Sequence, residues 1–237
     1  MKTFFLFALS SILLTTTKVD QPNKPNGGYY VLAKSGLRLR AAADLDAQKK
    51  ATIPFGAKVE IIEPALEQDM LVDNFPGGMA KVKYGDLTGF VFDGYLCKMP
   101  VRQKIENDLN NYKEWVRGKG GYILFENCER DYDGYYQSEQ IIIPYITDWA
   151  EVYLLAKTLF DLPFDFPKAS TKAEETFENP KKGEYVWEDS LTIERDETGK
   201  IKQITRYLRS EGGGITIMIE EDGQQNSLRI SKTEIAD

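Results

Sequence analysis

Five carboxylates lie close together in the second half of the chain, where they could supply acid–base chemistry: Glu126, Glu129, Asp131, Asp133 and Glu139. Two carboxyl groups at a suitable separation can hydrolyse a glycosidic bond, one as the acid and the other as base or nucleophile. Surface turns are often acidic because charged side chains are well solvated there, and this simpler interpretation is favoured. No metal site is predicted, because the third ligand and the closing glutamate of a calcium loop are out of register.

The chain contains no histidine, and this absence excludes several classes of hydrolase. Cysteine peptidases and Ser-His-Asp hydrolases use histidine as the base that activates their nucleophile. The zinc amidases of the cell wall bind their metal through histidine. We therefore predict no catalytic residues and no cofactor, and we keep a carboxylate-dependent, glycosidase-like hydrolase as the alternative.

Two blocks in the first half predict a small β-structure. Residues 36–40 alternate leucine and arginine after a glycine, and residues 89–96 form a strand that ends in an Asp-Gly turn. Other short strands are predicted at 29–33, 58–63 and 81–84. The intervening residues 64–78 are too many for a simple hairpin and carry apolar side chains, so we expect them to fold back or to contact a partner.

These two blocks resemble the opening and closing motifs of bacterial SH3 (SH3b-like) domains, and the resemblance covers about residues 29–99. It implies a small SH3-like β-barrel of the kind often appended to exported cell-envelope proteins. Members usually read Gly-Leu-Asn-Val-Arg-Ser-Gly-Pro at the first block, where this chain has Arg38 for the asparagine and two alanines for the glycine and proline. Met79 and Phe90 stand where the family commonly has tryptophan.

A ligand-binding groove, if this domain has one, is predicted to use four of its side chains: Phe90, Tyr84, Tyr95 and Arg40. Aromatic faces can stack on a sugar or a peptide, and the arginine can add a charged contact. The alternative interpretation is that the same residues pack the barrel.

The N-terminus has the pattern of a signal peptide, because Lys2 is followed by a short apolar run. This run is too short for a helix that crosses a bilayer, which needs about 20 apolar residues. We assign residues 1–17 to the signal peptide and residues 18–28, rich in proline and glycine, to a linker. The mature chain is therefore expected to be exported, soluble and not membrane-spanning, in the periplasm or outside the cell.

The rest of the chain predicts a linker helix at 100–118 and an α+β domain of no recognised family at 119–237. Apolar residues recur at helical spacing up to Gly118. The second domain should contain strands near 122–125 and 140–146, a helix that Asp148 caps, a loop at 162–182, and an antiparallel β-meander beyond it. The predicted fold class is α+β overall.

Charge and cysteine content restrict the partners. Thirty basic and 37 acidic residues give a net charge of −7, which repels phosphate backbones and excludes nucleic acid as a favoured partner. Cys97 and Cys128 are the two cysteines, and they form either a disulfide between the domains or two separate buried thiols.

The sequence thus predicts an exported, non-enzymatic binding or scaffold protein of the bacterial cell envelope. Its expected partner is a wall component or another envelope protein, and its oligomeric state stays open. A protein that inhibits or sequesters a ligand is a third class, which a deep apolar cavity inside the meander would favour.

Overall fold

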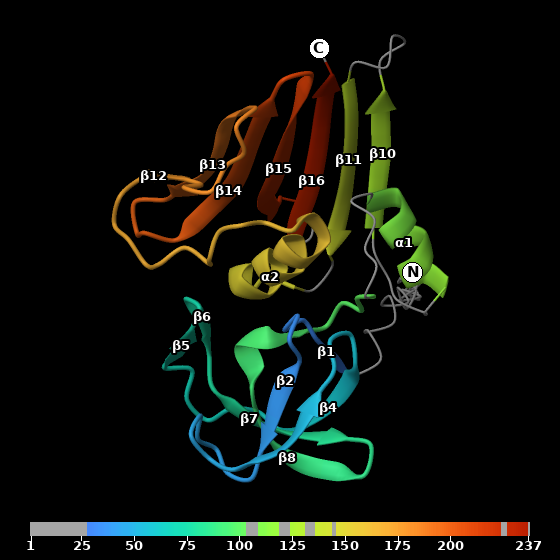
Figure 1. Cartoon of the computed structure of the whole chain (residues 1–237), viewed down its shortest axis with the longest axis vertical. Helices are drawn as coiled ribbons and strands as arrows, with labels where there is room; N and C mark the ends of the chain where they lie inside the picture. The colour runs from blue at the N-terminus through green and yellow to red at the C-terminus, as the bar shows by residue number, and fades with distance from the viewer. Residues whose placement is uncertain are drawn as a thin grey trace, which may run out of the picture.

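The structure is a computed structural model that describes residues 28–102, 109–118, 124–130, 136–143, 146–223 and 227–236, with only the backbone for 124–130. The predicted signal peptide and nearly all of the predicted linker lie outside these ranges. The described residues form two seven-stranded antiparallel sheets, a two-stranded hairpin and two α-helices (Figure 1). This agrees with the predicted α+β class in its coarse features.

The N-terminal sheet has the strand order β3-β2-β8-β7-β4-β1-β9. Its strands are β1 (Tyr29–Val31), β2 (Leu37–Arg40), β3 (Lys49–Ile53), β4 (Lys58–Glu63), β7 (Met79–Tyr84), β8 (Leu87–Phe92) and β9 (Leu96–Cys97). A 3-10 turn, η1 (Asp93–Tyr95), joins the last two. The alternation in β2 buries Leu37 and Leu39 in a small apolar core. The structure has strands at each of the predicted positions, with ends that differ by two residues in β1, β7 and β8, and it adds β3 and the two-residue β9.

This sheet does not close into the barrel that we predicted. Strands β3 and β9 lie at opposite ends of the hydrogen-bonded order, where β3 pairs with β2 and β9 pairs with β1. Strand β9 has only two residues, so it offers little edge for a further partner. Strand β3 was missed because its lysines and threonine are exposed and leave no alternating apolar pattern.

The long segment 64–78 forms a hairpin that reaches the second domain. Its strands β5 (Met70–Val72) and β6 (Phe75–Gly77) are joined by Asp73 and Asn74, both with positive φ, as a two-residue hairpin turn requires. Phe75 is 1% exposed. Its ring lies 6.1 Å from the ring of Tyr153 in the second domain. The expected fold-back thus places this hairpin against the other domain.

The C-terminal sheet has the order β10-β11-β16-β15-β14-β13-β12, and every neighbouring pair is antiparallel. Its strands are β10 (Leu124–Arg130), β11 (Tyr136–Ile143), β12 (Glu174–Glu178), β13 (Val186–Arg195), β14 (Ile201–Ser210), β15 (Gly213–Asp222) and β16 (Ser227–Ala236). The predicted meander corresponds to β13 to β16. Strand β12 lies in the predicted loop 162–182; this prediction was wrong because an edge strand of mostly exposed glutamates lacks the apolar alternation.

Helix α1 (Leu109–Gly118) covers the second half of the predicted linker helix. Residues 101 and 102 are not helical, which corrects the start of the prediction, and residues 103–108 lie outside the described ranges. Leu109, Tyr112 and Val116 are buried in the main core. The expected packing of its apolar stripe is confirmed.

Helix α2 (Trp149–Phe160) begins where the sequence predicted. The Asp148 side chain accepts a hydrogen bond from the backbone N–H of Ala150 at 2.9 Å, which caps the helix. Its C-terminal cap, Asp161, has left-handed backbone angles (φ 51°, ψ 49°). Local chemistry therefore sets both ends of this helix.

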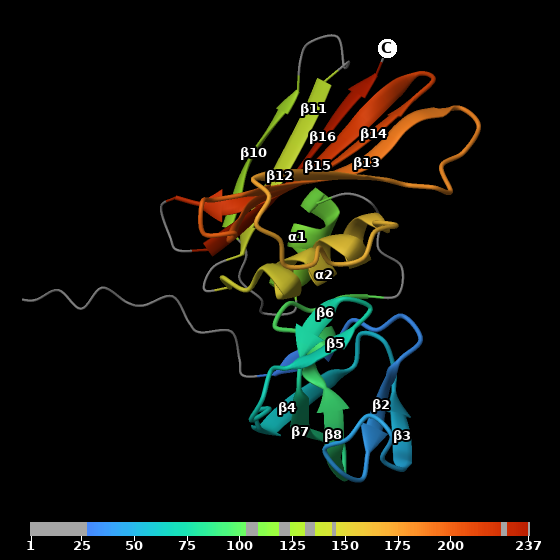
Figure 2. The ribbon, with the colours of Figure 1, turned by 90° about the vertical axis from the view of Figure 1, so that its left-hand side faces the viewer.

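The position of α2 was not predicted. It lies between the two sheets, with the C-terminal sheet on one side and the N-terminal sheet and its hairpin on the other (Figures 1 and 2). Side chains all around it are consequently buried, including Val152, Tyr153 and Leu154, rather than those of one face. One continuous core joins residues of both domains through this helix.

Candidate functional site

A groove of about 520 Å³ lies at the seam between the two domains. Three parts of the chain line most of it: the β1–β2 loop with strand β2, the β5–β6 hairpin with η1, and helix α2 with the segment that follows it. Leu45 of the β2–β3 loop and Phe92 at the end of β8 complete the lining. Two of the four predicted ligand-binding residues, Arg40 and Tyr95, line this groove. Phe90 and Tyr84 are not among its lining residues.

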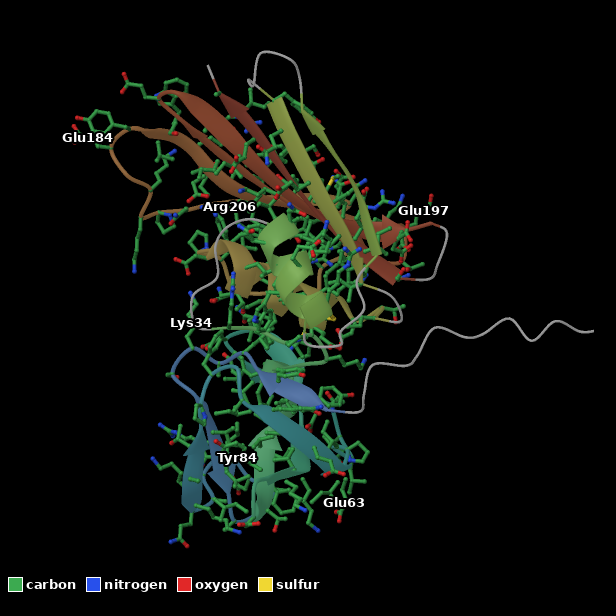
Figure 3. All side chains as sticks on the ribbon, turned by 90° about the vertical axis from the view of Figure 1, so that its right-hand side faces the viewer. Lys34, Glu63, Tyr84, Glu184, Glu197 and Arg206 are labelled. Carbon is green, nitrogen blue, oxygen red and sulfur yellow. The ribbon has the colours of Figure 1, made fainter. Side chains whose placement is uncertain are left out.

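Phe90 and Tyr84 are half-buried in the N-terminal sheet. Phe90 lies opposite Arg40 in the β2–β8 pairing and packs against the main core. Tyr84 packs against the small core at the far end of the β7–β8 hairpin. Figure 3 shows Tyr84 well away from Lys34, which is at the level of the seam. These two aromatic residues therefore pack within the N-terminal sheet, which was the alternative to a role in ligand binding.

Strand β2 presents two arginines at the groove. Arg38 is exposed and Arg40 is half-buried, and both side chains lie on the face opposite the buried Leu37 and Leu39. The Arg40 guanidinium donates from Nη1 to the carbonyl oxygen of Ala47 at 2.8 Å. A strand thus fixes both cations on one wall of the groove.

The hairpin wall contains a tyrosine–aspartate pair. The Tyr95 hydroxyl donates a hydrogen bond to the Asp73 carboxylate. Its ring lies 5.7 Å from the ring of Phe75 and 5.7 Å from that of Phe92. Burial raises the pKa of Tyr95, and the bond to Asp73 and its negative charge raise that pKa further. Tyr95 is therefore a neutral donor held by aromatic packing.

Helix α2 supplies the opposite wall through Leu154, Lys157 and Thr158, which share one face by their spacing of three and four. The Lys157 ammonium donates to the carbonyl oxygen of Phe164 and lies 3.7 Å from Oδ1 of Asp165. Burial lowers the pKa of Lys157, and the nearby Asp165 carboxylate partly opposes this effect. We did not predict these residues; a lysine within an apolar helical run was the one available signal.

Two ion pairs connect the domains, and one of them involves a residue that lines the groove. Lys34 and Asp161 form an exposed pair at its rim, and the hydrogen bond from Lys34 lowers the pKa of that carboxyl. Lys98 binds Glu151 of α2, which is 9% exposed. The exposed pair contributes little stability, whereas the buried one must satisfy a desolvated carboxylate.

The predicted carboxylate cluster does not line the seam groove. Glu139 is buried, and its Oε2 accepts a hydrogen bond from the backbone N–H of Leu109 at 3.0 Å. It therefore attaches α1 to strand β11. The structure describes only the backbone of Glu126 and Glu129. Asp131 and Asp133 lie outside the described residues. Where side chains are described, no group of three or more acidic or cysteine residues could hold a metal ion.

Cys97 is a free thiol that is fully buried. Its Sγ accepts a hydrogen bond from the backbone N–H of Met99 at 3.3 Å. Burial raises the pKa of this thiol, and the neighbouring Glu151 carboxylate adds to the rise. Cys128 belongs to strand β10, and its side chain lies outside the description. Of the two predicted alternatives, a disulfide or separate buried thiols, Cys97 has the form of a separate buried thiol.

Other hollows lie at the strand ends of the C-terminal domain. One of about 520 Å³ is lined mainly by polar residues of the β13–β14 turn, and one of about 320 Å³ surrounds the turn at Gly212. Positive φ at Gly212 and Gly213 shows that this glycine run makes a turn, as predicted. A further hollow of about 400 Å³ also joins the domains, but Asn74 is the one N-terminal residue among those that line it. The seam groove takes its lining from several elements of both domains.

Comparisons with known proteins found no matching family model, no matching curated protein and no matching solved structure. In the part of the chain that the structure describes, no helix is long and apolar enough to cross a membrane.

Proposed function

We propose that this chain is an exported, non-enzymatic binding protein of the bacterial cell envelope. Its SH3-like N-terminal sheet and its C-terminal α+β domain bind one ligand together. The observation that carries the proposal is the seam groove, because residues of both domains line it. Sites between domains are common places for ligands, since two surfaces can enclose a small molecule there.

The size and lining of the groove support a small ligand or a short segment of a larger one. Its volume of about 520 Å³ lies in the usual range for small-molecule sites, about 300–1,000 Å³. A wall component or an extended segment of an envelope protein fits this scale. A folded partner domain would instead need a broad, flat surface.

The arrangement of polar groups favours binding over catalysis. The acids that line the groove are Asp73 and Asp165; the first accepts a hydrogen bond from Tyr95 and the second pairs with Lys157. A glycosidase needs one carboxyl as acid and another as base or nucleophile across the scissile bond. Each acid here is engaged by a neighbouring side chain within its own wall of the groove.

Filling the groove tests this proposal. Leu45 is half-buried and lines the groove, so Leu45→Trp should occupy space that the ligand needs. Leu66 is fully exposed and is not a lining residue, so Leu66→Trp is the matched control. We expect purified murein or detergent-extracted envelope proteins to capture the unaltered chain and the control, and Leu45→Trp to lose capture. Empty captures from both baits would overturn the proposal.

A further inference from the structure

We infer that the seam groove binds a small amphipathic anion, with an oxyanion head group held by Arg38 and Arg40 and an apolar body on the groove floor. The inference rests on the proposed function and names the class of ligand. It follows from three properties of the groove: the placement of the arginines, the balance of charge, and the apolar floor.

The two arginines are placed to act on one group. They are two residues apart in β2 and on the same face, so their Cα atoms are separated by about 6.6 Å, given about 3.3 Å per residue in a strand. A guanidinium presents several N–H donors in a planar fork that suits a carboxylate or a phosphate. Two such forks from one rigid strand can enclose a single oxyanion.

The charge of the groove is opposite to that of the whole chain. Its lining contains four basic residues and two acidic ones, whereas the chain has a net charge of −7. Lys34 is paired with Asp161 and Lys157 lies beside Asp165, so their charges are largely offset.

The arginine charges have no such partner among the described residues. Arg40 donates to the neutral carbonyl of Ala47, and Arg38 makes no hydrogen bond or ion pair with any of them. Asp73 is the remaining acid of the lining, and it accepts from the Tyr95 hydroxyl. The groove therefore keeps an excess of positive charge on the β2 wall, which complements an anionic ligand.

The floor of the groove is apolar. Phe75, Phe92 and Leu154 are 1%, 4% and 3% exposed, and the half-buried Leu45 and Val72 flank them. Phe75, Phe92 and Leu154 are already nearly buried, so among these five it is Leu45 and Val72 that offer apolar surface for a hydrocarbon or aryl group to cover. Removing such surface from water favours binding by about 25 cal/mol per Å². A fully polar anion would leave this floor wet, and a neutral hydrocarbon would leave the arginines without a partner.

Four probes with the same ten-carbon tail separate the contributions of head and tail: undecanoate, decyl phosphate, decanol and decyltrimethylammonium. Their binding to the full chain is measured by calorimetry below the micelle concentration. We expect the two anions to bind and the alcohol and the cation to bind at least about tenfold more weakly. The stronger of the two anions identifies the preferred head group, and added salt should weaken both.

Variants locate the binding. Arg38→Gln and Arg40→Gln should each weaken anion binding about tenfold or more, and Leu45→Trp should abolish it. Lys83→Gln removes a charge from an exposed position on β7 outside the groove, so it should leave binding unchanged. Thermal unfolding of each variant separates lost binding from lost folding.

Several results would overturn the inference. Equal binding of all four probes, or anion binding that survives both arginine substitutions, would show that the arginines do not select the ligand. If no probe binds while Leu45→Trp still abolishes capture of envelope components, the ligand class is wrong and the proposed function stands. If no probe binds and neither bait captures the chain, both are wrong.

Discussion

The carboxylate of Glu151, in helix α2, accepts a hydrogen bond from the backbone N–H of Lys98 at 2.6 Å, and its other oxygen lies 3.4 Å from the Lys98 ammonium. Lys98 directly follows strand β9, so this contact links the end of the N-terminal sheet to the helix between the domains. Because Glu151 is 9% exposed, the bond to Lys98 must offset the removal of a carboxylate from water.

The stability of the protein should therefore depend on pH through Glu151. Burial raises the pKa of this carboxyl above its ordinary value of 4.5, and Lys98 only partly opposes that rise. Between 4.5 and the raised pKa the folded chain holds a proton that the unfolded chain releases, so the free energy of unfolding falls as pH rises through this window.

Glu151→Gln should remove this dependence, because the amide stays neutral at every pH and still accepts from the Lys98 N–H. Glu151→Ala should cost about 1–3 kcal/mol, since it leaves that N–H buried without an acceptor. Urea unfolding from pH 4 to 8 measures both effects. If the free energy of unfolding changes with pH in the same way in the unaltered chain and in Glu151→Gln, the prediction is wrong.

Phe75→Ala should destabilise the protein by about 3–5 kcal/mol, the usual cost of emptying a buried phenylalanine site. The Phe75 ring stacks on Phe166 at 5.8 Å and contacts Tyr153, so the loss falls on the contact between the domains. Leu71→Ala in the same hairpin is the control; Leu71 is 67% exposed, and we expect a change within about 0.5 kcal/mol. If Phe75→Ala and Leu71→Ala unfold at the same urea concentration, the hairpin does not pack on α2 in solution.

Asp148→Ala should cost about 1 kcal/mol, because the Ala150 N–H at the start of α2 would lose its side-chain acceptor. Asp148→Asn should retain most of the stability, since asparagine caps helices equally well. Thermal unfolding of both variants provides the measurement. A similar loss in both would show that the negative charge of Asp148 matters more than its hydrogen bond.

Cys97 should react with thiol reagents only when the chain unfolds, because the thiol is buried and burial raises its pKa. In a Cys128→Ser variant, alkylation of Cys97 should follow the rate of unfolding. The unaltered chain, denatured without reductant and alkylated, should show two modified cysteines by mass. If neither cysteine is alkylated in the denatured chain, the two cysteines are joined in a Cys97–Cys128 disulfide.

The elements that were predicted correctly are those with local signals. Asp148 precedes an apolar helical run, and the turn 196–199 and the glycines at 212–214 separate strands of alternating pattern. The missed strands β3 and β12 are at sheet edges. Their exposed polar side chains have no apolar pattern, and only a neighbouring strand defines them.

The candidate site could be predicted only in part. Arg40 and Tyr95 belong to the motifs of the first domain, and Asp73 comes from a hairpin of the same domain whose position the sequence does not specify. Lys157 meets them only after α2 docks against that domain. Phe90 and Tyr84 are aromatic like Tyr95, but they pack in the N-terminal sheet and do not line the groove. Sequence patterns identify suitable side chains and do not specify which of them meet.

The sequence by itself determined the absence of histidine chemistry, the net negative charge, and the positions of most strands and of helix α2, because each depends on composition or on near neighbours. Only the tertiary structure decided that the N-terminal sheet stays open, that α2 is buried on all sides and that a basic, apolar-floored groove forms at the seam. These features require contacts between residues far apart in the chain, and such contacts depend on how whole faces of sheets and helices pack.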